Sequence, residues 1–337
     1  MKNERRPIAV YYEHPEWFRP LFAELDKRGL PYVKIDASRH SYDPSNTAEA
    51  ADTYALVFNR MSASAYLRGH GNALFYTRGY LAHLERAGAR VVNGYDAFAV
   101  ETSKALQLTL LESLGLAYPR TRVINSASEA ARAAGEIGFP VMFKPNVGGR
   151  GAGVVRYDTP ESLEREVKEG RVDLGIDSTA LLQEFVPARG GHITRVETLG
   201  GKYLYAIKVY TSGESFNLCP AEICQLEDAQ PVAAGEVCLA DAPKAGLKIE
   251  AYTPPPEVIE AVESIAKAAR LDLGGVEYIT DERDGRNLYY DINALSNFVA
   301  DAAVVVGFDP HERLVDFLLE EAERCVTDTG SRFSAAG

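Results

Sequence analysis

The sequence lacks any apolar run that could cross a membrane, since its longest, Ala302 to Phe308, is far shorter than the roughly 20 residues a spanning helix needs. It also lacks a block of Lys or Arg, and its 48 acidic against 36 basic residues give a formal charge of −12. Such a chain has no general electrostatic attraction for a nucleic-acid backbone or an anionic membrane. We therefore expect neither partner, and any anionic ligand must be held by a local site.

Cysteine is also scarce. No two of the four cysteines form a Cys-x-x-Cys pair, and no apolar signal segment follows the charged N-terminus. We therefore expect a cytoplasmic protein whose cysteines remain thiols. A zinc site built from the first three is the alternative; the four are Cys219, Cys224, Cys238 and Cys325.

The length allows two or three domains. Short apolar runs such as Ile8–Tyr12 and Tyr54–Phe58 alternate with helical patterns such as Ala73–Arg86, which predicts a parallel sheet with helices on its faces. A longer helix is expected from Val100, with Gly115 as its stop. The expected segments are an N-terminal α/β domain over 1–100, a central unit over 101–186, a C-terminal unit over 187–330 with a closing helix near Glu312–Arg324, and a loose tail over 331–337.

A glycine-rich loop lies between two predicted strands, Phe139–Lys144 and Gly153–Tyr157. Thr159-Pro160 then starts a predicted helix, with Thr159 as its cap and Pro160 at its first position. The loop has neither the Gly-Lys-Ser/Thr ending of a Walker loop nor the order of a dinucleotide fingerprint. Glycines let backbone N–H groups approach a phosphate, and Lys144, embedded in an apolar strand, needs a counter-charge. The loop is therefore a candidate phosphate site, with a mobile surface turn as the alternative; its glycines are Gly148, Gly149, Gly151 and Gly153.

A predicted hairpin near the C-terminus carries two acids and an amide, Glu277, Asp291 and Asn293. With Gly285 in the left-handed position of the turn, Glu277 lies opposite Asp291 and Tyr278 opposite Tyr290. Facing carboxylates repel unless a cation neutralises them, and two carboxylates with an amide oxygen suit Mg²⁺. A solvated hairpin face is the alternative.

The predicted strand Ala180–Val186 runs into Pro187, where pairing must stop. The backbone groups freed there can read an adenine edge, although most such strand ends are only buried structure. The residues concerned are Gln183, Glu184, Phe185 and Val186.

The order of these features resembles the ATP-grasp superfamily, most closely the carboxylate–amine ligases related to glutathione synthetase, the ribosomal-protein glutamate ligases and the lysine-biosynthesis ligase. The resemblance implies an α/β, ATP-grasp fold, in which an N-terminal βαβ domain precedes two α+β subdomains that clamp ATP. It runs from about Ser103 to Asn297 through Lys104, Lys144, the glycine loop, Gln183 to Val186, Arg195, Glu277 and Asp291-Ile292-Asn293.

The resemblance also implies roles. Lys104 and Lys144 would contact the α- and β-phosphates, the glycine loop would close over the β- and γ-phosphates, and the backbone of Glu184 and Val186 would hold adenine. The catalytic cations would be Arg195 and Lys208. Mg²⁺, as one or two ions with Mn²⁺ as the alternative, would be held by Glu277, Asp291 and Asn293. The sequence departs from the family pattern at Ile193-Thr194, Lys208 and Asp291, where the family usually has Asp-Ile, Arg and Glu.

An amide bond requires an activated carboxylate, and ATP supplies one as an acyl phosphate. We therefore expect an ATP-dependent ligase acting on a small-molecule or peptide carboxylate and an amine. Either substrate on a carrier protein, and a homo-oligomer, stay open. The expected substrate residues are Arg60, Ser62 and Asn217. Arg60 would grip a substrate carboxylate through two hydrogen bonds, with a surface arginine as the alternative. The alternatives are a carboxylate kinase, a non-catalytic ATP-binding module and, disfavoured by the loop, a dinucleotide oxidoreductase.

Overall fold

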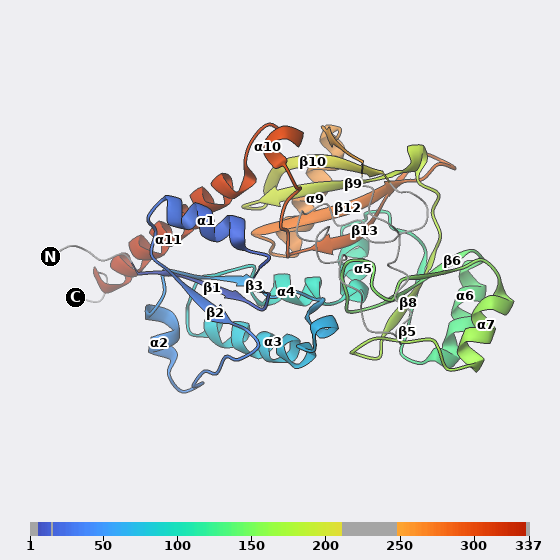
Figure 1. Ribbon diagram of the computed structural model, residues 1–337, viewed down its shortest axis with the longest axis horizontal. Helices are drawn as coiled ribbons and strands as arrows, with labels where there is room; N and C mark the ends of the chain where they lie inside the picture. Colours follow the sequence, from blue (N-terminus) through green and yellow to red (C-terminus); the bar gives the residue numbers. More distant parts are fainter. Residues whose placement is uncertain (1–5, 15, 211–247, 335–337) are drawn as a thin grey trace.

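The computed structural model describes residues 6–14, 16–210 and 248–334. Three sheets organise these residues, as Figure 1 shows. Asn217, Cys219, Cys224 and Cys238 lie outside the described residues, so the predictions on them stay predictions. None of the described helices is long and apolar enough to cross a membrane.

The N-terminal sheet is parallel, with the order β2-β1-β3-β4. Alternate residues of β1 enter two different cores, because successive side chains on a strand point to opposite faces. Ile8 and Val10 pack with α1 and α11, whereas Ala9 and Tyr11 pack with α3. The elements are β1 (Ile8–Tyr12), α1 (Arg19–Lys27), β2 (Tyr32–Asp36), α2 (Thr47–Asp52), β3 (Leu56–Arg60), α3 (Gly71–Arg86), β4 (Val91–Val92) and α11 (Pro310–Ser334).

The central sheet is antiparallel, with the order β5-β8-β6-β7, and α6 and α7 pack on it. Thr159 caps α7 by accepting a hydrogen bond from the Ser162 N–H, as the Thr159-Pro160 sequence predicts. The elements are β5 (Thr121–Ile124), α6 (Ala130–Ile137), β6 (Val141–Pro145), β7 (Val155–Tyr157), α7 (Pro160–Lys168) and β8 (Ala180–Glu184).

The C-terminal sheet is antiparallel, with the order β11-β10-β9-β12-β13. The predicted pairing of Glu277 with Asp291 is confirmed, and Gly285 has the expected positive φ. A bulge after Glu277 makes the predicted pairing of Tyr278 with Tyr290 wrong, because Tyr278 pairs instead with Tyr289. The elements are β9 (His192–Leu199), β10 (Lys202–Tyr210), β11 (Ile249–Tyr252), α9 (Pro256–Ala268), β12 (Leu273–Thr280) and β13 (Asn287–Asn293).

Two helix predictions need correction. The expected single helix from Val100 is divided into α4 (Tyr95–Glu101) and α5 (Lys104–Ser113), because Ser103 is extended and caps α5 through the Leu106 N–H. The closing helix α11 continues to Ser334, into the predicted tail. The remaining short elements are α10 (Ala302–Val305) and the 3₁₀ turns Ala65–Arg68, Ala127–Glu129 and Arg189–Gly191.

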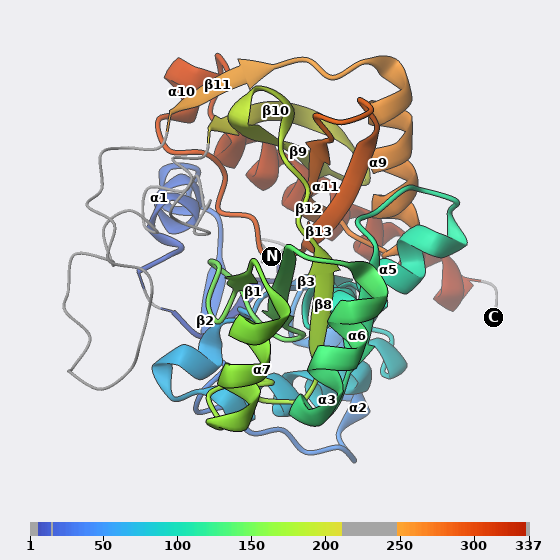
Figure 2. The ribbon, with the colours of Figure 1, turned by 90° about the vertical axis from the view of Figure 1, so that its right-hand side faces the viewer.

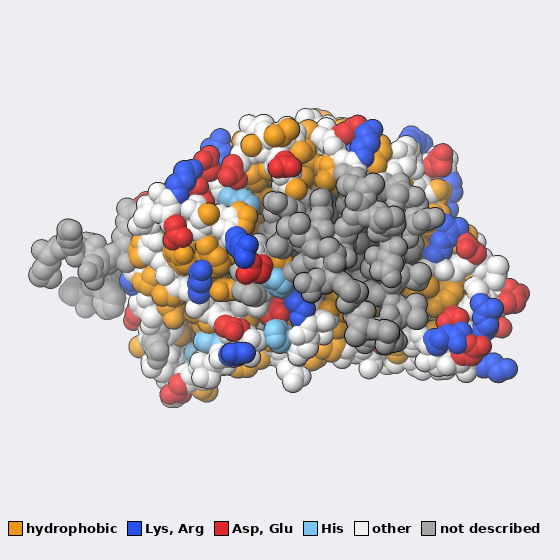
Figure 3. Space-filling model, viewed as in Figure 1, with side chains coloured by type: hydrophobic (Ala, Val, Ile, Leu, Met, Phe, Trp, Pro, Cys, Tyr) orange, Lys and Arg blue, Asp and Glu red, His pale blue; other side chains and the backbone are white. Residues whose placement is uncertain are grey.

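The three sheets meet around one region of the molecule. Figures 1 and 2 both place β13 and α5 where the C-terminal sheet approaches the central unit, and α11 beside α1 on the N-terminal unit. On the face drawn in Figure 3, acidic and basic side chains of the described residues are interspersed. That face therefore presents mixed charge.

Candidate active site

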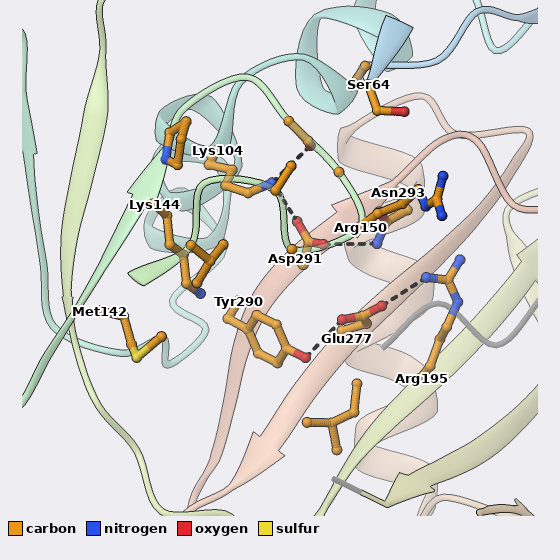
Figure 4. Close-up of a pocket in the computed structure, with 18 of the residues that line it drawn as sticks. Ser64, Lys104, Met142, Lys144, Arg150, Arg195, Glu277, Tyr290, Asp291 and Asn293 are labelled. Atoms are coloured by element: carbon orange, nitrogen blue, oxygen red, sulfur yellow. Dashed lines mark hydrogen bonds and ion pairs between the residues drawn. The ribbon is translucent and has the colours of Figure 1, made fainter. Parts of the chain in front are cut away.

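A cavity of about 410 Å³ lies where the three units meet. This volume falls within the roughly 300–1,000 Å³ typical of small-molecule sites. β6, the glycine loop and β8 line one side, and β9, β12 and β13 line the other. Trp17, Ser62 and Ser64 contribute from the N-terminal unit. Figure 4 shows the side chains converging from these elements.

Two lysines form the cationic part of the cavity. Lys104 begins α5, and its Nζ lies 3.3 Å from Asp291 Oδ1 and 3.4 Å from the Gly148 carbonyl oxygen. Lys144 on β6 donates to Gln183 Oε1 at 2.7 Å, and its Nζ lies 5.0 Å from the centre of the Tyr290 ring. Burial lowers the Lys144 pKa to about 8, although the field of Asp291 opposes this. The counter-charge that the sequence required is thus Asp291, acting at a distance.

Two acids face the lysines from the terminal hairpin. Burial raises the pKa of Asp291, but Lys104 and Lys144 together bring it below its ordinary value. Burial and the neighbouring Asp291 raise the pKa of Glu277, against the opposing effect of Arg195. Tyr290 donates from its hydroxyl to Glu277 Oε2 at 2.8 Å, a contact that the bulge makes available. The two carboxylates therefore lie in different electrostatic environments.

The oxygen atoms of the terminal hairpin are ligands of the type that a hard cation prefers. Within the described ranges, no cluster of three or more His, Cys, Asp or Glu side chains could bind a metal by itself. Glu277 and Asp291 offer carboxylate oxygens, and the Asn293 Nδ2 donates to Asp291 Oδ2 at 3.3 Å, which holds this amide beside them. Mg²⁺ is commonly bound by one or two carboxylates and completed by substrate phosphates and water. This set is therefore suited to Mg²⁺ that arrives with a nucleotide.

Arg195 lies between two carboxylates. Its Nε donates to Glu197 Oε1 at 2.6 Å and its Nη1 to Glu277 Oε1 at 2.8 Å. Burial lowers the Arg195 pKa, but the two acids raise it above its ordinary value, so the guanidinium stays charged. Gly275 on the neighbouring strand β12 leaves space for Arg195, because a Cβ at this position would overlap the guanidinium.

The glycine loop forms a wall of the cavity, where Gly148, Gly149, Arg150 and Gly151 line it. Gly153 does not line it but shapes the turn, with a φ of +70° and no room for a Cβ beside Pro145. At the strand end, Gln183 to Val186 all line the cavity.

Two predicted site residues are placed elsewhere. β10 pairs Ile207 with Arg195 and Lys208 with Thr194, so Lys208 lies on the opposite face of the sheet, with its Nζ 4.5 Å from the Tyr252 ring centre. This placement does not support the predicted catalytic role of Lys208, which stays a prediction.

Arg60 is fully buried, and its Nη2 donates to the Ser296 carbonyl oxygen and to Asn297 Oδ1. A guanidinium binds a carboxylate at two points through Nη2 together with either Nε or Nη1. Because Nη2 of Arg60 already has two partners, the predicted two-point grip on a substrate carboxylate is not available in this arrangement. Ser62 does line the cavity, and its hydroxyl lies 2.8 Å from that of Ser64.

Two acids and a tyrosine are among the lining residues that were not predicted. Glu101 ends α4, and its buried carboxylate accepts from the Ala294 N–H. Glu197 and Tyr290 each adjoin a predicted motif, two residues after Arg195 and one before Asp291. Strand alternation could have found Glu197, whereas Tyr290 required the bulge and Glu101 required the tertiary structure.

Sequence comparisons match part of this chain to known proteins. Residues 103–187 match the family model "Carbamoyl-phosphate synthase L chain, ATP binding domain". A probable alpha-L-glutamate ligase of Teredinibacter turnerae is 30% identical over 135 residues, which cover 40% of this chain and 44% of that protein. Probable alpha-L-glutamate ligase 1 of Pseudoalteromonas atlantica is 30% identical over 186 residues, covering 55% and 58%. The chain thus spans about half the length of these curated relatives.

Solved structures match over nearly the whole chain. The ATP-grasp ligase PsnB, complexed with minimal precursor, Mg and ADP, has a TM-score of 0.63 and 20% identity, covering 96% of this chain and 99% of that one. D-alanine–D-alanine ligase from Bacillus anthracis, complexed with ATP, has a TM-score of 0.63 and 16% identity, covering 96% and 98%. These likenesses confirm the predicted ATP-grasp fold, and the sequence matches agree with the resemblance to the ATP-grasp superfamily.

Proposed function

We propose that this protein is an ATP-dependent carboxylate–amine ligase that works through an acyl phosphate. The observation that carries the proposal is the arrangement of two lysines and two acids across one cavity. Lys104 and Lys144 suit phosphate oxygens, whereas Glu277 and Asp291 suit Mg²⁺. The names of the relatives, which are glutamate and D-alanine ligases, support the same reaction class.

ATP would lie with its phosphates between the lysines and the glycine loop. The Glu184 and Phe185 N–H groups already donate to the carbonyl oxygens of Arg120 and Pro140. We therefore assign the adenine contact to the backbone of Val186, which lines the cavity, and to the Glu184 carbonyl oxygen. Closure of the glycine loop over the phosphates would exclude the water that hydrolyses acyl phosphates.

Mg²⁺, as one or two ions, would be held by Glu277, Asp291 and Asn293, and Mn²⁺ could take the same oxygen ligands. When bound with ATP, the metal supplies neutralisation of phosphate charge. Lys104, which contacts Asp291 in the free protein, would turn its charge towards the phosphates once that acid binds the cation.

The chain's own groups would act by charge and position. The substrate carboxylate oxygen attacks the γ-phosphorus, ADP leaves, and an acyl phosphate forms. The amine then attacks the acyl carbon, the carbon–oxygen bond to phosphate breaks, and the amine gives up a proton as the amide forms. Arg195, held between its two carboxylates, would stabilise the transferring phosphoryl group.

The substrates of the relatives suggest a class. The relatives include ligases named for glutamate, and PsnB was solved in complex with a precursor peptide. We infer an amino-acid or peptide carboxylate and an amine, with Ser62 and Asn217 among the substrate contacts. A cytoplasmic location belongs to the same proposal, whereas a carrier-borne substrate and self-association stay open.

A screen for ADP release tests this function. The full chain would be incubated with MgATP and paired amino acids, short peptides and small acids. ADP release that requires both a carboxylate and an amine, with an amide product found by mass spectrometry, is the expected result. ADP release with a carboxylate alone, trapped by hydroxylamine, would favour the carboxylate kinase, and binding of MgATP without turnover would favour the non-catalytic module.

A further inference from the structure

Glu197 lines the cavity, and one of its carboxylate oxygens is buried without a hydrogen-bond donor among the described residues. It follows Arg195 by two residues on β9, so both side chains lie on one face of the sheet. The side chain of Glu197 is 1% exposed, and Oε1 accepts from Arg195 Nε at 2.6 Å. Within the part of the chain that the structure describes, no donor reaches Oε2. Buried carboxylate oxygens are rarely left without a donor, so a partner for this atom has to be found.

The charges around Glu197 do not balance. Arg195 is shared with Glu277, so one guanidinium serves two buried carboxylates. Burial lowers the Arg60 pKa to about 9, and the fields of Glu101 and Glu197 oppose that fall, yet Arg60 pairs with neither acid. Its Nη2 is bound to the Ser296 carbonyl oxygen and Asn297. This end of the cavity therefore holds three acids against two guanidinium groups.

An ionised carboxylate can only accept hydrogen bonds, so the missing partner is a donor. We propose that Glu197 recognises the amine substrate, with Oε2 accepting a hydrogen bond from its nitrogen. This inference rests on the proposed ligase function and adds the residue that selects a primary amine. Arg195 is the positioning residue, because its bond to Oε1 fixes the direction of Oε2.

Glu197 could instead serve Arg195 alone or hold a buried water. A carboxylate that only orients Arg195 would need a single oxygen, and Oε1 already supplies it. A water could also occupy Oε2, because water bridges many polar groups inside proteins. In neither case would Glu197 distinguish an amine from its acylated form.

The experiment uses the full chain with Mg²⁺ and a non-hydrolysable ATP analogue. The probes are the twenty proteinogenic L-amino acids and the N-acetyl form of each one that binds, and the affinities are measured by thermal shift and calorimetry. At least one amino acid should stabilise the wild-type protein, and its N-acetyl form should not. Glu197→Gln should weaken that amino acid about tenfold or more and reduce the preference over the N-acetyl form by the same factor, while the nucleotide affinity changes less than about threefold.

Glu24→Gln is the matched control. Glu24 is also a buried carboxylate that accepts from an arginine, Arg28 Nε at 2.6 Å, but it lies on α1 and does not line the cavity. This variant should lower the melting temperature and leave both affinities unchanged. Glu197→Asp, which keeps the charge, supplies the same measurement if Glu197→Gln does not fold.

Equal affinity and equal preference in wild type and in the folded Glu197 variant would overturn the inference. It would also fall if no amino acid stabilised the analogue-bound wild type, and the ATP-binding part of the proposed function would then survive. Failure of the analogue itself to bind would remove the proposed function as well.

Discussion

The two ends of the cavity differ in charge and in how they are built. The phosphate end has Lys104 and Lys144 beside the glycine loop, and one acid, Asp291, balances them. Around Arg195 and Arg60, the acids Glu101, Glu197 and Glu277 outnumber the two guanidinium groups, and Glu277 also faces the lysine end beside Asp291. Such a distribution would let a strongly acidic chain bind an anion at one end of a site, because the cations are concentrated there. The cavity is thus suited to a nucleotide at one end and a donor of hydrogen bonds at the other.

Asp291→Asn should have the largest effect, because Asp291 links the two ends. We expect loss of MgATP-dependent turnover by roughly 100-fold or more, since a metal ligand and its charge disappear. The variant also leaves Lys104 without its partner at 3.3 Å, so the free protein should lose about 2 kcal/mol of stability. Enzyme assays and urea unfolding on the same preparation measure both quantities.

The stability that Asp291 contributes should fall at low pH. The folded-state pKa of Asp291 is lowered, so its stabilising contribution should be present above the unfolded value of about 3.9 and be lost as the pH falls through the folded pKa. Asp281→Asn, in the same hairpin, is the control: Asp281 is buried and paired with Arg283 but does not line the cavity. Mg²⁺-dependent turnover retained by Asp291→Asn would rule out its role as a metal ligand.

Lys144→Met should act on the phosphate end alone. We expect ATP affinity to fall roughly 10–100-fold, because a buried charge that faces phosphate is removed. In the wild type, affinity should weaken as the pH rises through about 8, where Lys144 loses its proton. An ATP affinity that is independent of pH from 7 to 9 would contradict this placement of the lysine.

The stability of the nucleotide-free protein should change with pH in the opposite direction to its ATP affinity. Because the folded pKa of Lys144 lies below its unfolded value of about 10.4, the unfolded state binds more protons between these values, and stability should rise with pH there. Urea unfolding of wild type and Lys144→Met at several pH values isolates this contribution as their difference. A difference that does not grow with pH would contradict the lowered pKa.

Gly275→Ala probes the acidic end. The added Cβ would overlap the Arg195 guanidinium, so we expect a loss of about 1–3 kcal/mol in stability and about tenfold in turnover. Gly135→Ala is the control, since a Cβ on that residue of α6 meets open space and alanine favours a helix. Unchanged stability in Gly275→Ala would mean that Arg195 does not lie against β12.

Lys208→Met should have the smallest effect. Lys208 lies on the face of the sheet opposite to Arg195, so ATP affinity and turnover should change less than about twofold. Lys144→Met removes the same charge from the cavity wall. Comparison of the two variants therefore separates the effect of a lysine's position from the effect of losing its charge. A loss in Lys208→Met as large as that in Lys144→Met would show that the assigned face is wrong.

How much could be predicted from sequence depended on whether a feature was local. The glycine loop, the Glu277–Asp291 pairing and the cap at Thr159 depend on neighbouring residues or on a short hairpin, and the sequence predicted them correctly. The bulge after Glu277 leaves no mark in the pattern, so Tyr290 was misplaced.

The remaining errors came from contacts between distant segments. Arg60 is bound by Ser296 and Asn297, more than 230 positions away, and this contact removed the predicted two-point grip. The face on which Lys208 lies depends on the pairing of β10 with β9, which contains an irregularity between Tyr203 and Tyr205. The family resemblance predicts a role for Lys208 but does not predict how β10 pairs with β9.

The central claim is that this cavity binds MgATP, and a thermal melt of the wild-type chain with increasing MgATP tests it most directly. We predict a melting temperature that rises with nucleotide concentration once it exceeds the dissociation constant, a much smaller rise in Lys144→Met, and none with NADH. A wild-type protein whose melting temperature responds to NADH and ignores MgATP would contradict the account.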